Sequence, residues 1–231
     1  MGLATIPDAE QSRNVILTES IVRDIIGAAR RQSAEFGLLV EVAAVTGARV
    51  SQLARIEVQD LQADRDAPRL MMPTSKKGKG QKAVQRRPVP LPTGLAAKLR
   101  ALSAGRPANT PLLVKPSGEP WRKSDHSRLF ARAAKAASEN PERVMMYALR
   151  HSSIVRQILA GVPIRIVAVN HDTSIAMLER TYSRHIGDHA GARRAIGDRR
   201  AGRGSGAAHG SKLDMPVLES PQRWSGRTAL T

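Results

Sequence analysis

The chain has 231 residues, enough for one or two domains, and 41% of them are hydrophobic, enough to build a core. Its 37 lysines and arginines against 20 aspartates and glutamates give a formal net charge of +17, which favours a polyanionic partner, most commonly nucleic acid. The sequence contains no cysteine, no start typical of a secretion signal and no apolar run long enough for a membrane helix. Disulfides and thiolate metal sites are excluded, and we expect a cytoplasmic protein with no membrane partner.

The first part of the chain is predicted to be helical. Residues 1–15 have no clear pattern and are expected to form a flexible lead-in. From Thr18, a residue type that caps helices, apolar side chains recur at helical spacing. A second apolar run ends at Thr46-Gly47, and a third helix is expected after Arg49. The expected buried side of this third helix consists of Leu53, Ile56 and Leu61.

Residues 69–91 have a different pattern, which is typical of a β-hairpin. A short strand is expected at 70–72, followed by a turn rich in lysine and glycine at 76–82 and a return strand around Val89 and Leu91. The return strand contains alternating prolines, which restrict it to the edge of a sheet. We therefore expect a mainly α fold with a small β-hairpin or three-stranded sheet at its edge (α+β).

The second part of the chain is again predicted to be helical. The expected helices cover 93–104, 124–138 and 144–160, with a short one from Pro163 and a last one running towards Ile186. Asp172 or Thr173 is the expected cap of the last helix. Residues 197–231 are rich in Gly, Ser, Arg and Pro, so we expect a disordered basic tail after one domain over 16–196.

Three separated segments contain the residue types that phosphate chemistry uses. Arg49 follows the Thr46-Gly47 turn, Arg150 and His151 lie in the segment 147–152, and His171 precedes Tyr182 by 11 residues. Taken singly, each has an ordinary explanation: an exposed arginine, polar helix residues, a capping histidine and a half-buried tyrosine. The lysine run between the first two segments is equally typical of a solvated loop. Their joint order is the informative feature.

That order resembles the tyrosine recombinase (phage integrase) family, over about residues 14 to 190. The pieces that carry the resemblance are TGARVSQLARIEVQDL, SKKGKG followed by RPVPLP, ALRHSS, and NHDTSIAMLERTY. Each motif is weak alone, but four in sequence at domain-scale spacing are a specific signal. The resemblance implies a catalytic domain that cuts and rejoins DNA strands through a 3′-phosphotyrosyl intermediate, without a metal or other cofactor.

The resemblance also implies a role for each matching residue. Tyr182 is the expected nucleophile, and the guanidiniums of Arg49 and Arg150 are expected to hold the scissile phosphate. His171 is expected to donate a hydrogen bond to this phosphate. Tyr147 occupies the position where the family usually has a histidine, and we expect it to act as a hydrogen-bonding catalytic residue, although a poorer base.

A lysine of the expected hairpin is the family's proton donor to the leaving 5′ oxygen. Lys76 fits this position best, and Lys77 and Lys79 are close competitors. The residues expected to contact DNA are Lys77, Lys79, Lys82, Arg86, Arg87 and His151. The expected partner is double-stranded DNA, on whose paired sites the protein would self-associate as a tetramer, in a prokaryotic setting. The chain has few aromatic residues, which favours contacts to the phosphate backbone over stacking on single strands.

The sequence also departs from the family pattern. Besides Tyr147, Gln52 occupies the position of a usual acidic residue, Asn170 replaces a glycine, and little chain precedes the catalytic pattern. These departures keep open an alternative: a catalytically inactive or truncated DNA-binding remnant of a mobile-element integrase. A basic RNA-associated structural protein would account for the charge, but not for the ordered Arg, Lys, Arg, His and Tyr.

Overall fold

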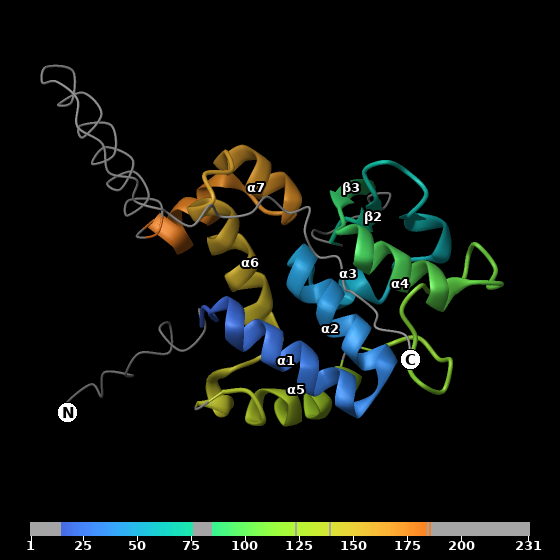
Figure 1. Cartoon of the computed structure of the whole chain (residues 1–231). Helices are drawn as coiled ribbons and strands as arrows, with labels where there is room; N and C mark the ends of the chain where they lie inside the picture. Colours follow the sequence, from blue (N-terminus) through green and yellow to red (C-terminus); the bar gives the residue numbers. More distant parts are fainter. Residues whose placement is uncertain (1–14, 76–84, 123, 139, 184, 186–231) are drawn as a thin grey trace, which may run out of the picture.

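The computed structural model describes residues 15–75, 85–122, 124–138, 140–183 and 185 (Figure 1). Several expectations lie outside these residues. They are the first fourteen residues of the lead-in, the lysine turn with Lys76, Lys77, Lys79 and Lys82, and the basic tail 197–231.

Each of the first two helices begins at a capping hydroxyl. Helix α1 (Glu19–Gln32) begins where the Thr18 hydroxyl accepts a hydrogen bond from the backbone N–H of Ile21, as the sequence predicted. Ser33 ends α1 and caps α2 (Ala34–Thr46) in the same way. Helix α2 is apolar nearly all round because it lies between α1 and α6 and is buried on both sides. Gly47, with a φ of +60°, ends it.

The third predicted helix is much shorter than expected. Helix α3 (Val50–Leu53) has only four residues, and Leu61 lies in a strand rather than on the buried side of this helix. After α3, the backbone N–H groups bond to acceptors outside the helix. The Val58 N–H donates to the Thr110 carbonyl, and the Glu57 N–H donates to the Asp60 carboxylate. These bonds support a short 3-10 helix, η2 (Val58–Asp60), in place of further α-helix.

The three-stranded sheet at the edge of the fold is confirmed. Strands β1 (Leu61–Gln62), β2 (Arg69–Pro73) and β3 (Arg86–Pro90) are antiparallel in the order β1-β2-β3. β3 is an edge strand, where its prolines cost no interior ladder bond. β2 ends at Pro73, two residues before Ser75, which becomes important in the site.

The remaining helices complete a mainly α fold, as expected. They are α4 (Thr93–Ser103), α5 (Asp125–Lys135), the 3-10 helix η3 (Pro141–Arg143), α6 (Tyr147–Leu159), α7 (Ile164–Asn170) and a final helix at 175–183. The last is capped by Ser174, whose hydroxyl accepts from the Met177 N–H, rather than by either expected residue. In Figure 1, α1 and α5 lie together at the bottom, the sheet and α4 to the right, and α7 at the top.

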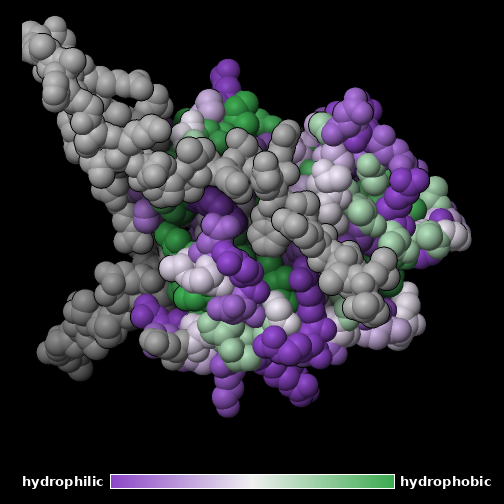
Figure 2. Space-filling view, viewed as in Figure 1, coloured by the Kyte–Doolittle hydropathy of each residue, from purple (hydrophilic) through white to green (hydrophobic). Residues whose placement is uncertain are grey.

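The buried apolar residues form two clusters. The larger joins α1, α2, α4, α5 and the sheet, with Phe36, Leu39 and Leu99 fully buried. The smaller joins α6, α7 and helix 175–183, and it includes Leu178 and the ring of Tyr182. Hydrophobic side chains are also exposed over α7 at the top of Figure 2, where Ile166 and Val169 are half exposed. In the described part of the chain, no helix has the length and apolar character needed to cross a membrane.

Candidate active site

Arg150, in the first turns of α6, connects the end of α2 to the end of α7. Its side chain is almost fully buried, and its Nη1 donates to the Gly47 carbonyl at 2.8 Å, while its Nη2 donates to the His171 carbonyl. Gly47 ends α2 and His171 ends α7, so one guanidinium holds both helix ends. Burial, together with the nearby charge of Arg49, lowers the pKa of Arg150, but a guanidinium remains charged at neutral pH.

Arg49 is held by a carboxylate that the sequence did not single out for this purpose. Its Nη1 lies 3.4 Å from Asp172 Oδ2, and the same oxygen accepts the backbone N–H of Ser75 at 2.8 Å and the Ser75 hydroxyl. Burial raises the pKa of Asp172, but the Ser75 hydrogen bonds and the charges of Arg87 and Arg49 outweigh it and leave the pKa below its usual value. Asp172 therefore holds the first arginine beside the end of β2.

Gln52, the residue at the usual acidic position, belongs to this same network. Its Nε2 donates to the Pro73 carbonyl at 2.8 Å and to Asp172 Oδ2 at 3.3 Å, and its Oε1 accepts the Arg49 backbone N–H at 3.1 Å. The side chain is fully buried. An amide has both donors and an acceptor, so Gln52 satisfies partners of both kinds that a carboxylate alone would not.

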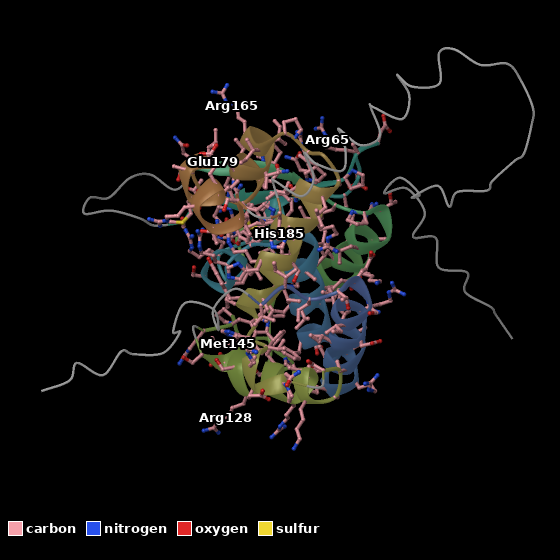
Figure 3. All side chains as sticks on the ribbon, turned by 90° about the vertical axis from the view of Figure 1, so that its left-hand side faces the viewer. Arg65, Arg128, Met145, Arg165, Glu179 and His185 are labelled. Carbon is pink, nitrogen blue, oxygen red and sulfur yellow. The ribbon has the colours of Figure 1, made fainter. Side chains whose placement is uncertain are left out.

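Five of the predicted site residues line one pocket of about 790 Å³. They are Arg49, Tyr147, Arg150, His151 and Tyr182. The two arginines, 101 positions apart in the sequence, thus face the same space, which is of the size that small ligands occupy. Figure 3 shows helix 175–183 towards the viewer, with Glu179 on it and Met145, which also lines the pocket, lower on the same side.

Tyr182 is buried with its hydroxyl against a histidine. Its Oη lies 2.5 Å from Nδ1 of His151, and only 4% of the residue is exposed. Burial raises the pKa of Tyr182 well above its ordinary value, while the charge of Arg150 acts in the opposite direction. Burial, and then the charge of Arg150, lower the pKa of His151 to about 4. His151 is therefore a buried partner of the tyrosine inside the pocket, and its expected contact with DNA stays a prediction.

His171 is not among the residues that line the pocket. The residue is fully buried, and neither ring nitrogen has a hydrogen-bond partner of good geometry among the described residues. Burial and the charges of Arg150 and Arg87 lower its pKa to about 3, against a small opposing effect of the Gly47 backbone. The contact to the site that the structure does show is made by the main chain, whose carbonyl accepts from Arg150.

Gly47 has no room for a side chain, because a Cβ there would lie 2.4 Å from Cε1 and 2.6 Å from Nδ1 of His171. We expect Gly47→Ala to lower the free energy of unfolding by about 2 to 5 kcal/mol, from left-handed strain and overpacking together. Gly105→Ala is the matched control: Gly105 also has a positive φ, of +74°, but nothing lies within 4 Å of the place that a Cβ would take. It should cost only about 1 to 2 kcal/mol. Urea unfolding measures both, and equal losses would contradict the packing argument.

The remaining predicted residues differ in their exposure and in their pairing with other side chains. Tyr147 is half exposed at the pocket, with its ring edge-on to His151 at 4.9 Å and 5.9 Å from Cζ of Arg150. Arg86 is paired with Asp60 and Glu57. Arg87 keeps Nε and Nη1 buried without a partner in the described part of the chain, and burial lowers its pKa to about 10.

The arrangement as a whole is suited to binding an oxyanion. The guanidiniums of Arg49 and Arg150 line a pocket that Tyr182 also lines. A third guanidinium, that of Arg87, lies close enough to His171 to lower the pKa of its imidazole. Guanidiniums match the geometry of phosphate oxygens and stay charged at any working pH. Among the residues described, no group of three or more His, Asp or Glu side chains is arranged to hold a metal ion.

Sequence reasoning missed three residues of this site: Asp172, Ser75 and the structural role of Gln52. The sequence pattern predicts only a capping role for Asp172, yet this residue has a φ of +48°, which aspartate tolerates better than most residues. Its partners lie 97 to 123 positions away in the sequence, so no local pattern points to them. The departure at Gln52 is a signal that the sequence does offer, because an amide at a usual carboxylate position brings a donor as well as an acceptor.

Comparisons with known proteins are consistent with this geometry. The sequence model of the phage integrase family matches residues 16–187. Among solved structures, the chain is similar to XerA recombinase, with 22% identity and a TM-score of 0.57 over 72% of this chain and 59% of that one. It is also similar to the Tn1549 transposon integrase in complex with transposon right end DNA, with 20% identity and a TM-score of 0.61 over 81% of this chain and 66% of that one. A third similar structure is a lambda integrase dimer bound to a COC′ core site, with 21% identity and a TM-score of 0.53 over 73% of this chain and 48% of that one.

These structural similarities concern the fold, because all three identities are below 25%. The chain spans about half to two thirds of the length of the three solved structures. No curated protein matches the chain.

Proposed function

Because the chain belongs to the phage integrase family, we propose that it is a site-specific DNA recombinase that cuts and rejoins strands through a 3′-phosphotyrosyl intermediate. The observation that carries this proposal is that Arg49, Arg150 and Tyr182, from three distant segments, line one pocket. We assign the catalytic domain to residues 16–196, and the family match over 16–187 supports this assignment.

In this proposal, Arg49 and Arg150 bind the non-bridging oxygens of the scissile phosphate. Arg150 uses two N–H groups on main-chain carbonyls, and a guanidinium has five, so three remain for phosphate. Charge builds on these oxygens as Tyr182 attacks the phosphorus, and donors held in place before the reaction stabilise it without reorganisation. The positive charge of Arg150 also favours the phenolate form of the nucleophile.

The other predicted catalytic residues take supporting roles in the proposal. Both ring nitrogens of His171 are buried without a partner among the residues that the structure describes, which supports a hydrogen bond to phosphate once the ring turns towards the pocket. Tyr147 lies at the pocket with an exposed hydroxyl-bearing side chain and is suited to hydrogen-bond the substrate. We assign the proton donor for the leaving 5′ oxygen to the lysine turn, with Lys76 first, on the family resemblance alone.

We propose double-stranded DNA as the substrate and partner. The net charge of +17 favours contact with a phosphate backbone. Two buried nitrogens of Arg87, which have no partner in the described part of the chain, support a further phosphate contact. Lys77, Lys79 and Lys82 remain proposed DNA contacts, whereas Arg86 is already paired with two carboxylates. The Tn1549 structure contains DNA, and lambda integrase is a tetramer on a Holliday junction, so we propose self-association on paired sites.

A covalent-capture experiment tests the proposal without knowledge of the target sequence. The protein is incubated with a pool of nicked duplexes of randomised sequence, and DNA that stays attached after denaturation in SDS is recovered and sequenced. We expect an adduct enriched in a common sequence, because the nick lets the cleaved end diffuse away and traps the phosphotyrosine. Salt-sensitive duplex binding without any adduct would instead identify the protein as an inactive DNA-binding remnant.

A further inference from the structure

The Tyr182 hydroxyl has a close polar contact, among the described residues, with a side chain that has no assigned catalytic role. His151 Nδ1 lies 2.5 Å from Tyr182 Oη, although the two residues are 31 positions apart and belong to different helices. Both side chains are buried and both line the pocket, so the contact lies where a bound phosphate would be. The edge of Tyr147 packs on the His151 ring at 4.9 Å and restricts its orientation.

The charge state of the pair follows from its surroundings. Burial, followed by the charge of Arg150, holds the pKa of His151 at about 4, so the imidazole is neutral at neutral pH. The tyrosine is protonated under the same conditions. A neutral imidazole has one nitrogen that accepts and one that donates, and Nδ1 accepts the phenol proton when the hydrogen is on Nε2. Among the described residues, the charged or titratable groups that line the pocket together with this pair are Arg49, Glu142, Arg143, Tyr147 and Arg150.

We propose that His151 is the proton acceptor for the nucleophile, an inference that rests on the recombinase function proposed above. As Tyr182 Oη bonds to phosphorus, the O–H bond breaks and its proton passes to His151 Nδ1. The bond from phosphorus to the 5′ oxygen breaks with its electron pair, and that oxygen takes a proton from the separate donor of the lysine turn. In rejoining, the 5′-hydroxyl attacks the phosphotyrosine and gives its proton back to the donor of the lysine turn, while His151 returns its own proton to the departing phenolate.

The substitution that tests this proposal is His151→Asn. The asparagine side chain places a hydrogen-bonding atom near the former Nδ1 position but cannot take up a proton, so it separates basicity from positioning. We expect DNA binding within about twofold of the wild type and adduct formation about 10² to 10³ times slower, the range in which general bases contribute. A variant that forms adduct at the wild-type rate would overturn the proposal.

The pH dependence gives a readout that a purely structural role would not change. Between pH 5 and pH 8 the wild-type rate should be nearly flat, because His151 stays neutral above its pKa of about 4. In His151→Asn the rate should rise with pH, since hydroxide or water must remove the proton. A flat profile in the variant, merely lowered, would show that His151 only positions the tyrosine and would overturn the proposal.

A modified substrate distinguishes the two proton transfers. A 5′-bridging phosphorothiolate has a leaving sulfur that needs no proton, so it compensates for loss of the proton donor. It should not restore the rate of His151→Asn, because the defect lies on the side of the nucleophile. Full rescue would reassign His151 to the leaving group and overturn the proposal.

The matched control is His126→Asn on α5. His126 is also partly buried, with Nδ1 unpartnered within the described residues and a pKa that burial lowers, but it does not line the pocket. We expect its adduct rate and pH profile to equal those of the wild type. If the wild-type protein itself forms no adduct, the recombinase function fails and this inference fails with it. If the wild type forms the adduct and His151→Asn does so at the same rate as His126→Asn, the recombinase function stands and only this inference fails.

Discussion

Replacing Tyr182 by phenylalanine is expected to abolish the covalent protein–DNA adduct, a loss of at least about 10³-fold in adduct formation. The substitution removes one buried oxygen and keeps the ring, which packs with Leu178 in the smaller apolar cluster. The fold should therefore survive, with a stability change of about 1 kcal/mol from the lost hydrogen bond to His151. Denaturing gels of the nicked-duplex reaction measure the adduct, and a filter-binding assay at fixed salt checks that DNA binding is retained.

Tyr147→Phe is the matched control, because Tyr147 is the other tyrosine of the sequence and lines the same pocket. We expect its adduct to persist, with a rate reduced by about tenfold or less, as for the loss of a supporting hydrogen bond. The opposite result, an adduct in Tyr182→Phe and none in Tyr147→Phe, would show that the nucleophile has been assigned to the wrong residue.

Arg150→Ala is expected to reduce both activity and stability. Adduct formation should fall by about 10² to 10³, as when a preorganised donor to a developing oxyanion is removed. The free energy of unfolding should fall by about 2 to 4 kcal/mol, because the carbonyls of Gly47 and His171 lose their buried donor. Arg150→Lys keeps the charge but not the planar fork, so it should recover part of the stability and little of the rate.

Arg156→Ala, on the same helix, separates these two effects. Its Nη2 donates to the Ala44 carbonyl at 3.2 Å, so it also ties α6 to α2, but it does not line the pocket. We expect a stability loss of about 1 kcal/mol and an adduct rate within about threefold of the wild type. Thermal unfolding and the adduct assay on both variants provide the comparison. Equal rate losses in the two would mean that Arg150 acts only by holding helices together.

Much of the fold could be predicted from local pattern. Thr18 caps α1 because a hydroxyl there accepts an orphan helix N–H, and Gly47 ends α2 because it alone takes the left-handed conformation without cost. The prolines of β3 fixed its place at the sheet edge. The third helix was predicted too long because its continuation depends on Thr110, whose carbonyl takes the Val58 N–H, and that partner lies 52 positions away.

The site was predictable only in part. Arg49, Arg150 and Tyr182 follow from motif order, and the structure places all three at one pocket. The hydrogen bonds around Asp172 and the contact between His151 and Tyr182 join residues that are far apart in sequence. Such contacts depend on how helices pack, and neither periodicity nor spacing encodes which side chain a packed helix will meet.

Arg150 is also a joint between the two apolar clusters. Its two main-chain acceptors belong to different parts of the molecule: the Gly47 carbonyl ends a helix of the larger cluster, and the His171 carbonyl ends a helix of the smaller. If the smaller cluster separates from the larger one while the larger stays folded, the guanidinium loses its hydrogen bond to the His171 carbonyl, and Tyr182 no longer lines the pocket. Amides of α7 that exchange with solvent at less than the global unfolding free energy would therefore report an open form of an otherwise folded domain.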